Sequence, residues 1–155
     1  MSTSEGSFTL RSSANADDAF AFLADFRHHP QWRDDVLAVT LHSGEDDPGV
    51  SYYRQTVRQG PGTAQRELRV DADPGTDGGT RTIRFVTLGD APVIASGRTT
   101  ITPHPDGSEV TVSIALEFHG AGVALRPVVA GILRRRMVSY RESLAKALQT
   151  VAAGD

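Results

Sequence analysis

The clearest candidate for chemistry in this sequence is an arginine at an inward-facing position of an expected strand. If Leu68 and Val70 in the stretch 64–73 face a core, the two-residue repeat of a strand turns Arg66 to the same side. A buried arginine needs a partner. Its fixed positive charge can hold a ligand carboxylate or stabilise a developing enolate or phenolate. The alternative is that Arg66 lies near enough to the strand start to reach solvent, and the sequence leaves both open.

Two polar residues on the preceding stretch, 50–59, follow the same logic. If Val57 faces inward, Tyr53 and Gln55 do so as well. The Tyr53 hydroxyl can donate a hydrogen bond or act as a general acid, so Arg66 and Tyr53 are the two candidates for catalysis. The alternative for Tyr53 is core packing with a hydroxyl that reaches water, which is the more common role.

The other residues that could take part in catalysis or metal binding lack the partner residues that such a site needs. His28 and His29 are adjacent, a spacing that rarely aims two rings at one metal ion, and no spaced set of metal ligands accompanies them. Ser139 has no visible base, and no G-x-S-x-G motif occurs. The sequence also contains no phosphate-binding or dinucleotide-binding glycine motif. We therefore predict neither a metal nor a cofactor.

The C-terminal stretch 127–152 has the periodicity of a long amphipathic helix. Apolar residues recur every three or four positions, at Val129, Leu133, Met137, Tyr140, Leu144, Leu148 and Val151. Tyr140 lies on this stripe, which favours core packing. The run from Arg134 to Arg136 favours a solvated helix face over a site for an acidic partner. A helix with one apolar face needs a large apolar partner, which only the strands before it can supply.

Those strands follow from alternation and turn residues. A strand is predicted at 7–13 after a frayed tail at 1–6, then a helix at 16–24 with Asn15 as its N-cap, and a second short helix near His28. Six further strands are predicted at 36–43, 50–59, 64–73, 80–88, 93–103 and 108–119. The turns between strands, such as 44–49, are short, so neighbouring strands are expected to run antiparallel. In the last strand, the alternation places His119 on the outward face. The predicted fold is α+β: a seven-stranded curved antiparallel sheet wrapped around the long C-terminal helix, with two short helices after the first strand.

Composition limits the function further. The 155 residues suit one domain, expected at 6–152, and the net charge of −3 argues against nucleic-acid or anionic-lipid partners. No cysteine is present, and no run of about 18 apolar residues predicts a membrane span. The polar start does not look like a secretory signal, so we expect a cytoplasmic protein. Lys146 is the only lysine among 16 basic residues, an arginine bias that points to a GC-rich bacterial genome. The oligomeric state is left open.

The segment from Ala14 to Trp32 carries a family resemblance. Its Phe22-Leu-Ala-Asp25 and Pro30-Gln-Trp32 parts, the Asp106-Gly107-Ser108 hairpin, and a last apolar strand that runs through glycine into the final helix are together similar to the helix-grip (SRPBCC) superfamily. This superfamily includes START lipid-transfer domains and birch-pollen-allergen-like proteins. The chain most resembles its polyketide cyclase/dehydrase-like group.

The resemblance implies a cavity between sheet and helix that holds a small hydrophobic molecule, with polyketide-like or aromatic compounds among the candidates. If the protein is an enzyme, the implied reaction is cofactor-independent cyclisation or dehydration. The rivals are a non-catalytic carrier of lipid or another hydrophobic ligand, and a protein whose own side chains fill the cavity. Trp32 would close the pocket or simply anchor the fold. The residues expected to contact the ligand are Trp32, Tyr53, Gln55, Arg66, Phe85, Phe118, Val129, Leu133 and Met137.

Overall fold

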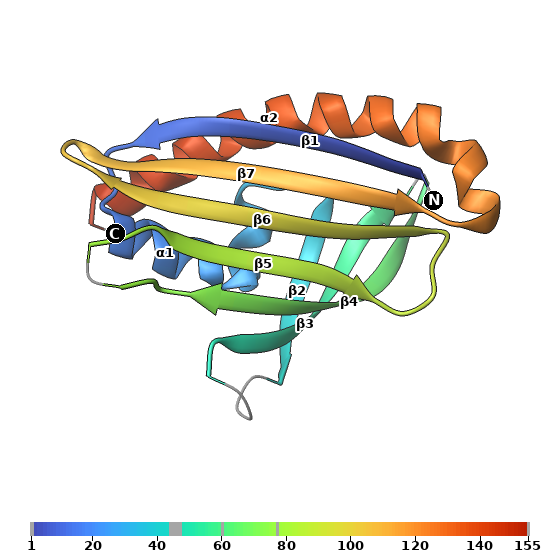
Figure 1. The fold of residues 1–155 in the computed structure, drawn as a ribbon, viewed down its shortest axis with the longest axis horizontal. Coiled ribbons are helices and arrows are strands. Elements are labelled where there is room, and N and C mark those ends of the chain that lie inside the picture. Colours follow the sequence, from blue (N-terminus) through green and yellow to red (C-terminus); the bar gives the residue numbers. More distant parts are fainter. Residues whose placement is uncertain (1, 44–47, 60, 77, 155) are drawn as a thin grey trace.

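A computed structural model describes residues 2–43, 48–59, 61–76 and 78–154. The described part is a curved antiparallel sheet of seven strands with a long helix lying across one face (Figure 1). This confirms the predicted fold, and the middle of the predicted turn at 44–49 lies outside the described residues. The elements in order are β1 (Ser2–Ser12), α1 (Ala16–Ala24), the 3-10 helix η1 (Phe26–Gln31), β2 (Val36–Ser43), β3 (Val50–Gln59), β4 (Gly62–Asp73), β5 (Arg81–Leu88), β6 (Val93–His104), β7 (Gly107–Phe118), the 3-10 helix η2 (Gly120–Leu125) and α2 (Arg126–Ala152).

The sheet has the strand order β1-β7-β6-β5-β4-β3-β2, so the first two strands of the chain form its opposite edges. β1 pairs with β7 from Ser2 opposite Phe118 to Ser12 opposite Ser108. The prediction of a frayed tail at 1–6 was therefore wrong for residues 2–6, because β7 extends far enough to offer them backbone partners. Gly6 has a packing role in this strand, since a Cβ there would lie 2.9 Å from Met137 Cγ of the crossing helix.

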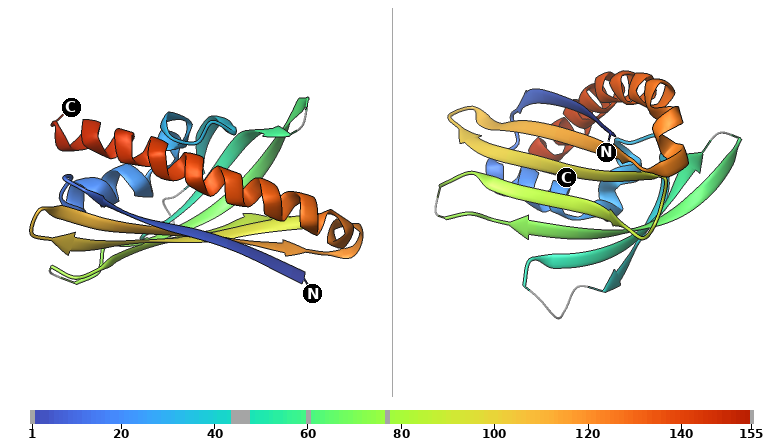
Figure 2. Two further views of the ribbon diagram at one scale, coloured as in Figure 1. Left: turned by 90° about the horizontal axis from the view of Figure 1, so that it is seen from above. Right: turned by 45° about the vertical axis from the view of Figure 1, so that its right-hand side comes forward.

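Side-chain caps set the turn that follows β1. Asn15 Oδ1 accepts a hydrogen bond from the Asp18 amide at 2.8 Å, which confirms the predicted N-cap of α1. Asp25 Oδ1 accepts from the Arg27 amide at 3.0 Å and so starts η1 where α1 ends. The two short helices lie beside α2 on the concave side of the sheet (Figure 2).

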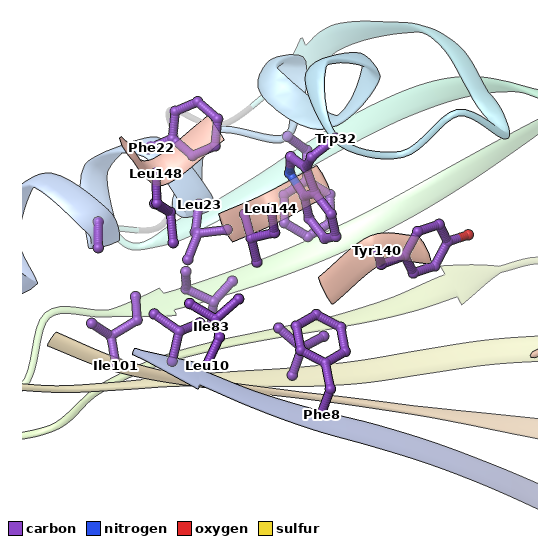
Figure 3. Close-up of a cluster of buried hydrophobic side chains, with 14 of the residues drawn as sticks. Phe8, Leu10, Phe22, Leu23, Trp32, Ile83, Ile101, Tyr140, Leu144 and Leu148 are labelled. Carbon is purple, nitrogen blue, oxygen red and sulfur yellow. The ribbon is translucent and has the colours of Figure 1, made fainter. Parts of the chain in front are cut away.

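The C-terminal half of α2 packs on a solid core. Leu144 and Leu148 are fully buried and meet side chains from α1 and the sheet, among them Leu10, Leu23 and Ile101 (Figure 3). The predicted apolar stripe is thus confirmed in its middle, whereas its two ends, Val129 and Val151, are only half-buried. The Tyr140 hydroxyl points away from the Leu144 and Leu148 side chains of this cluster (Figure 3).

The passage from β7 into α2 is more structured than the glycines there suggested. Residues Gly120–Leu125 form η2, whose Gly122 is buried and contacts the Pro92 carbonyl so closely that no side chain fits between them. This contact joins the start of α2 to the β5–β6 connection. Among the described helices, none has the length and apolar composition needed to cross a bilayer.

Candidate functional site

A cavity of about 610 Å³ lies between the sheet and the N-terminal half of α2. Its volume falls in the range of roughly 300–1,000 Å³ that is typical of small-molecule sites. Much of its wall is apolar, from side chains of β5, β6, β7 and α2: Phe85, Ala95, Ile114, Leu116, Val129 and Leu133. Exposed residues of the β5–β6 connection, including Gly89 and Asp90, form the rim, so the cavity reaches solvent there.

One end of the cavity is polar and is formed by a chain of hydrogen-bonded side chains from β4, β3 and η1. Arg66 Nε donates to Gln55 Oε1 at 3.3 Å, and Gln55 Nε2 donates to His29 Nδ1 at 2.9 Å. Because His29 Nδ1 accepts, this ring carries its proton on Nε2 and is neutral. Burial, followed by the positive charges of Arg33 and Arg66, holds the pKa of His29 well below its ordinary value. His29 therefore orients Gln55, which in turn orients Arg66.

A second polar cluster joins the residues just before β2 to α2. Asp35 Oδ1 accepts a hydrogen bond from the Tyr140 hydroxyl at 2.7 Å. Asp35 Oδ2 lies 3.3 Å from Arg33 Nη2 and 3.5 Å from Arg136 Nη1. The Arg33 guanidinium carbon also lies 4.9 Å from the centre of the Tyr140 ring. Burial alone would raise the pKa of Asp35, but Arg33, the Tyr140 hydroxyl and Arg136 outweigh it and lower this pKa, so the carboxylate is ionised near neutrality.

Sequence reasoning missed most of this second cluster. Arg33 and Asp35 are only 7% exposed, and the exposed Asp34 between them gives a two-residue alternation that is the one local signal. The prediction of a solvated face at residues 134–136 holds for the first two arginines and is wrong for Arg136. Arg136 is three residues after Leu133, so it borders the apolar stripe and reaches Asp35 across the cavity.

The structure brings five of the nine expected ligand contacts to the cavity wall: Gln55, Arg66, Phe85, Val129 and Leu133. Arg66 faces inward and is partly buried, rather than extending into solvent from the strand start.

The other four residues, Trp32, Tyr53, Phe118 and Met137, are buried but do not line this cavity. Trp32 packs edge-on against Tyr140, with ring centres 5.8 Å apart, and Tyr53 stacks on Phe26 at 5.5 Å. Met137 lies under β1 at Gly6. Their side chains fill the space between closely packed elements, so they do not border this cavity.

The histidine pair is divided between two roles. His28 Nδ1 donates to the Phe22 carbonyl at 2.7 Å and its ring stacks on that of Phe22, while His29 faces Gln55. Within residues 2–43, 48–59, 61–76 and 78–154, no group of three His, Cys, Asp or Glu side chains is placed to hold a metal ion. His119 is exposed, as its position in the alternation predicted.

A curved antiparallel sheet that encloses a ligand-sized cavity with a C-terminal helix defines the helix-grip class of proteins. The chain belongs to the family described as polyketide cyclase/dehydrase and lipid transport, whose sequence profile matches residues 5–153. This confirms the resemblance noted in the sequence. A search of curated proteins gives no match.

Solved structures of the same fold come from several bacteria. The Zhui aromatase/cyclase of a Streptomyces species is 17% identical, with 98% of this chain and 94% of that chain covered and a TM-score of 0.76. A STAR-related lipid transfer protein of Xanthomonas axonopodis is 21% identical over 94% of this chain and 85% of that chain, with a TM-score of 0.69. A START superfamily protein of Mycobacterium smegmatis is 20% identical, with 97% of each chain covered and a TM-score of 0.67. At these identities the likeness is one of fold.

Proposed function

We propose that this protein binds a small, largely apolar molecule in the cavity between the sheet and α2. The observation that carries the proposal is the 610 Å³ cavity with apolar walls and a polar end at Gln55 and Arg66. Such cavities bind apolar ligands because few well-held waters must leave, while a few polar groups fix the orientation. The family description, which names both polyketide chemistry and lipid transport, supports the ligand class.

The test is a fluorescence titration with a neutral apolar probe, N-phenyl-1-naphthylamine. We expect one saturable site with a dissociation constant on the order of micromolar, or roughly −8 kcal/mol. Ala95 on β6 lines the cavity, so Ala95→Phe should weaken binding by tenfold or more. The matched control is Ala115→Phe on β7, because Ala115 lies on the outer face of the sheet and should leave binding unchanged.

Two results would contradict the proposal. If the probe does not saturate in the wild type, the cavity is closed to ligands and the protein's own side chains fill it. If Ala95→Phe and Ala115→Phe weaken binding equally, the probe binds elsewhere or responds to lost stability. Thermal melts of both variants separate these cases.

A second candidate function, cyclisation with dehydration, is favoured by one observation: a fixed guanidinium at the polar end of the cavity. In such a reaction, a proton leaves a methylene between two carbonyls, and the resulting enolate carbon attacks another carbonyl carbon of the same chain. The new alkoxide takes up a proton to become a hydroxyl group. This hydroxyl leaves as water together with the remaining proton of the attacking carbon, and a carbon–carbon double bond forms. Arg66 would stabilise the enolate oxygen. Tyr53, the other candidate for catalysis, is not among the residues that line this cavity.

This candidate is tested with a synthetic poly-β-ketone thioester and product analysis by mass spectrometry. A product lighter by one water, formed faster with wild type than with buffer or with Arg66→Leu, would support catalysis. Saturable probe binding with no rate enhancement in any such assay would leave the protein as a carrier.

A further inference from the structure

We propose that the ligand carries one carboxylate, and that this carboxylate binds end-on to the terminal nitrogens of Arg66. The inference rests on the proposed binding function and adds the chemical class of the ligand: an amphipathic monocarboxylic acid rather than a neutral lipid.

At the polar end of the cavity the buried and half-buried charges do not balance. Arg33, Arg66 and Arg136 line this end, and Asp35 is the one buried carboxylate among the described lining residues. These four side chains sum to +2 in a chain whose net charge is −3, and the other charged lining residues, Arg58, Glu67 and Asp90, belong to the rim. His29 is neutral and adds nothing to it. Uncompensated positive charge in a half-desolvated site is costly unless an anion joins it.

Asp35 already has partners for both of its carboxylate oxygens. Its two oxygens accept from Tyr140 and lie within ion-pair distance of Arg33 and Arg136, at 3.3 and 3.5 Å. Among the described residues, Arg66 has no carboxylate at ion-pair distance. Within the described part of the chain, its guanidinium donates one hydrogen bond, to the neutral amide of Gln55. Arg66 is thus the cation at this end to which the described residues supply no counter-charge.

The Arg66 guanidinium is also held in an orientation that suits a carboxylate. Gln55 uses the Nε of Arg66 and is itself fixed by His29, so the guanidinium is held with its terminal nitrogens unused by any described residue. In the described part of the chain, the buried side-chain nitrogen and oxygen atoms without a hydrogen-bond partner are Trp32 Nε1 and Arg33 Nε. The Arg66 terminal nitrogens are not among these buried atoms, so they remain accessible. Two parallel N–H groups match the two oxygens of a carboxylate. Burial and the charge of Arg33 lower the pKa of Arg66, a strain that a bound anion would relieve.

The charges at the rim do not cancel this preference. Arg58 and Asp90 are exposed and of opposite sign, and Glu67 already pairs with Arg54 at 2.9 Å on the outside of the sheet. Exposed charges are screened by salt within about 10 Å at 0.1 M, whereas a partly buried pair is screened much less. Preference for an anion should therefore persist at higher ionic strength.

The experiment compares two nearly isosteric probes, 1-pyrenebutanoic acid and its primary amide, in fluorescence titrations at pH 7.5. We expect wild type to bind the acid on the order of tenfold more tightly than the amide, in both 0.05 and 0.5 M NaCl. Arg66→Met should remove most of that ratio while keeping amide binding. The matched control is Arg69→Met, which deletes the same charge from the outer face of the same strand, where Arg69 pairs with Asp71 at 3.3 Å. It should keep the wild-type ratio.

The outcomes separate the two proposals. If neither probe saturates, the binding function itself fails. If the amide binds as tightly as the acid in wild type, the binding function stands and the carboxylate inference is overturned. Equal loss of the ratio in Arg66→Met and Arg69→Met also overturns it, because net charge alone would then explain the effect. If Arg66→Met does not fold, Arg66→Lys keeps the charge without the paired donors and should bind the acid less tightly than wild type.

Discussion

The Tyr140 hydroxyl offers the sharpest test of the buried polar cluster. Tyr140→Phe removes the donor to Asp35 Oδ1 at 2.7 Å and an acceptor for Arg33 Nη2 at 3.4 Å, while the ring and its contact with Trp32 remain. Tyr140 is 1% and Asp35 7% exposed, so water has little access to replace the lost group. A hydrogen bond to a charged group contributes about 1.5–3 kcal/mol, so we expect the free energy of unfolding to fall by about 2 kcal/mol at pH 7.

The assay is chemical denaturation followed by far-ultraviolet circular dichroism. The control is Tyr52→Phe, a partly exposed tyrosine on the other face of β3, which should cost less than about 0.5 kcal/mol. The folded-state pKa of Asp35 is depressed, so its contribution to stability is present above its unfolded value of about 3.9 and is lost as the pH falls through the folded pKa. The hydroxyl of Tyr140 is one cause of that depression. The gap between wild type and Tyr140→Phe should therefore narrow below about pH 4.

Two results would refute this reasoning. A loss below about 0.5 kcal/mol at pH 7 would mean that the hydroxyl does not stabilise a buried carboxylate. A gap of constant size down to acid unfolding would mean that Asp35 is not the charged partner.

Three further predictions concern packing and metal. Met137→Ala should lower the free energy of unfolding by roughly 2–5 kcal/mol because Met137 is buried under β1, whereas Leu133→Ala should lower it less because Leu133 borders an existing cavity. Denaturant melts of both variants measure this difference, and a larger loss for Leu133→Ala would contradict the placement of the cavity. Gly97→Ala should cost about 1–3 kcal/mol, since its Cβ would overlap the Phe85 ring, and should also weaken probe binding. Exhaustive treatment with a chelator should leave the melting temperature unchanged, and one equivalent of zinc or iron found by elemental analysis of untreated protein would show this prediction to be wrong.

Local patterns in the sequence predicted the layers of this protein. The alternation of Val110, Val112 and Ile114 can bury only one face of a strand, and the three-to-four-residue spacing from Leu133 to Leu148 can bury only one face of a helix. These periods follow from the backbone geometry of strands and helices, so they can be recognised in the sequence without knowing which element packs against them. The same alternation placed Gln55 and Arg66 on the inner side of the sheet.

Tertiary structure decided where the strands extend and which buried side chains border open space. Residues 2–6 are polar and carry no strand signal, yet they pair with β7 because the neighbouring strand is long enough to receive them. Met137 and Leu133 are both buried and one helical turn apart, but only Leu133 lines the cavity. That difference depends on how far the helix stands from the sheet at each point, which no local pattern encodes.

The polar cluster shows the same division most clearly. Sequence alone established that the chain has basic residues near both Trp32 and Leu133, and it favoured a solvated role for those on the helix. Asp35 and Tyr140 are 105 positions apart in the chain and meet only because α2 returns across the sheet to the start of β2. The ionisation of Asp35, and the lack of a carboxylate beside Arg66 among the residues that the structure describes, follow from burial and from charges brought by other elements. The charge state of Asp35 and the surroundings of Arg66 depend on residues that are distant in the sequence and close in space, so neither could be predicted before the fold was known.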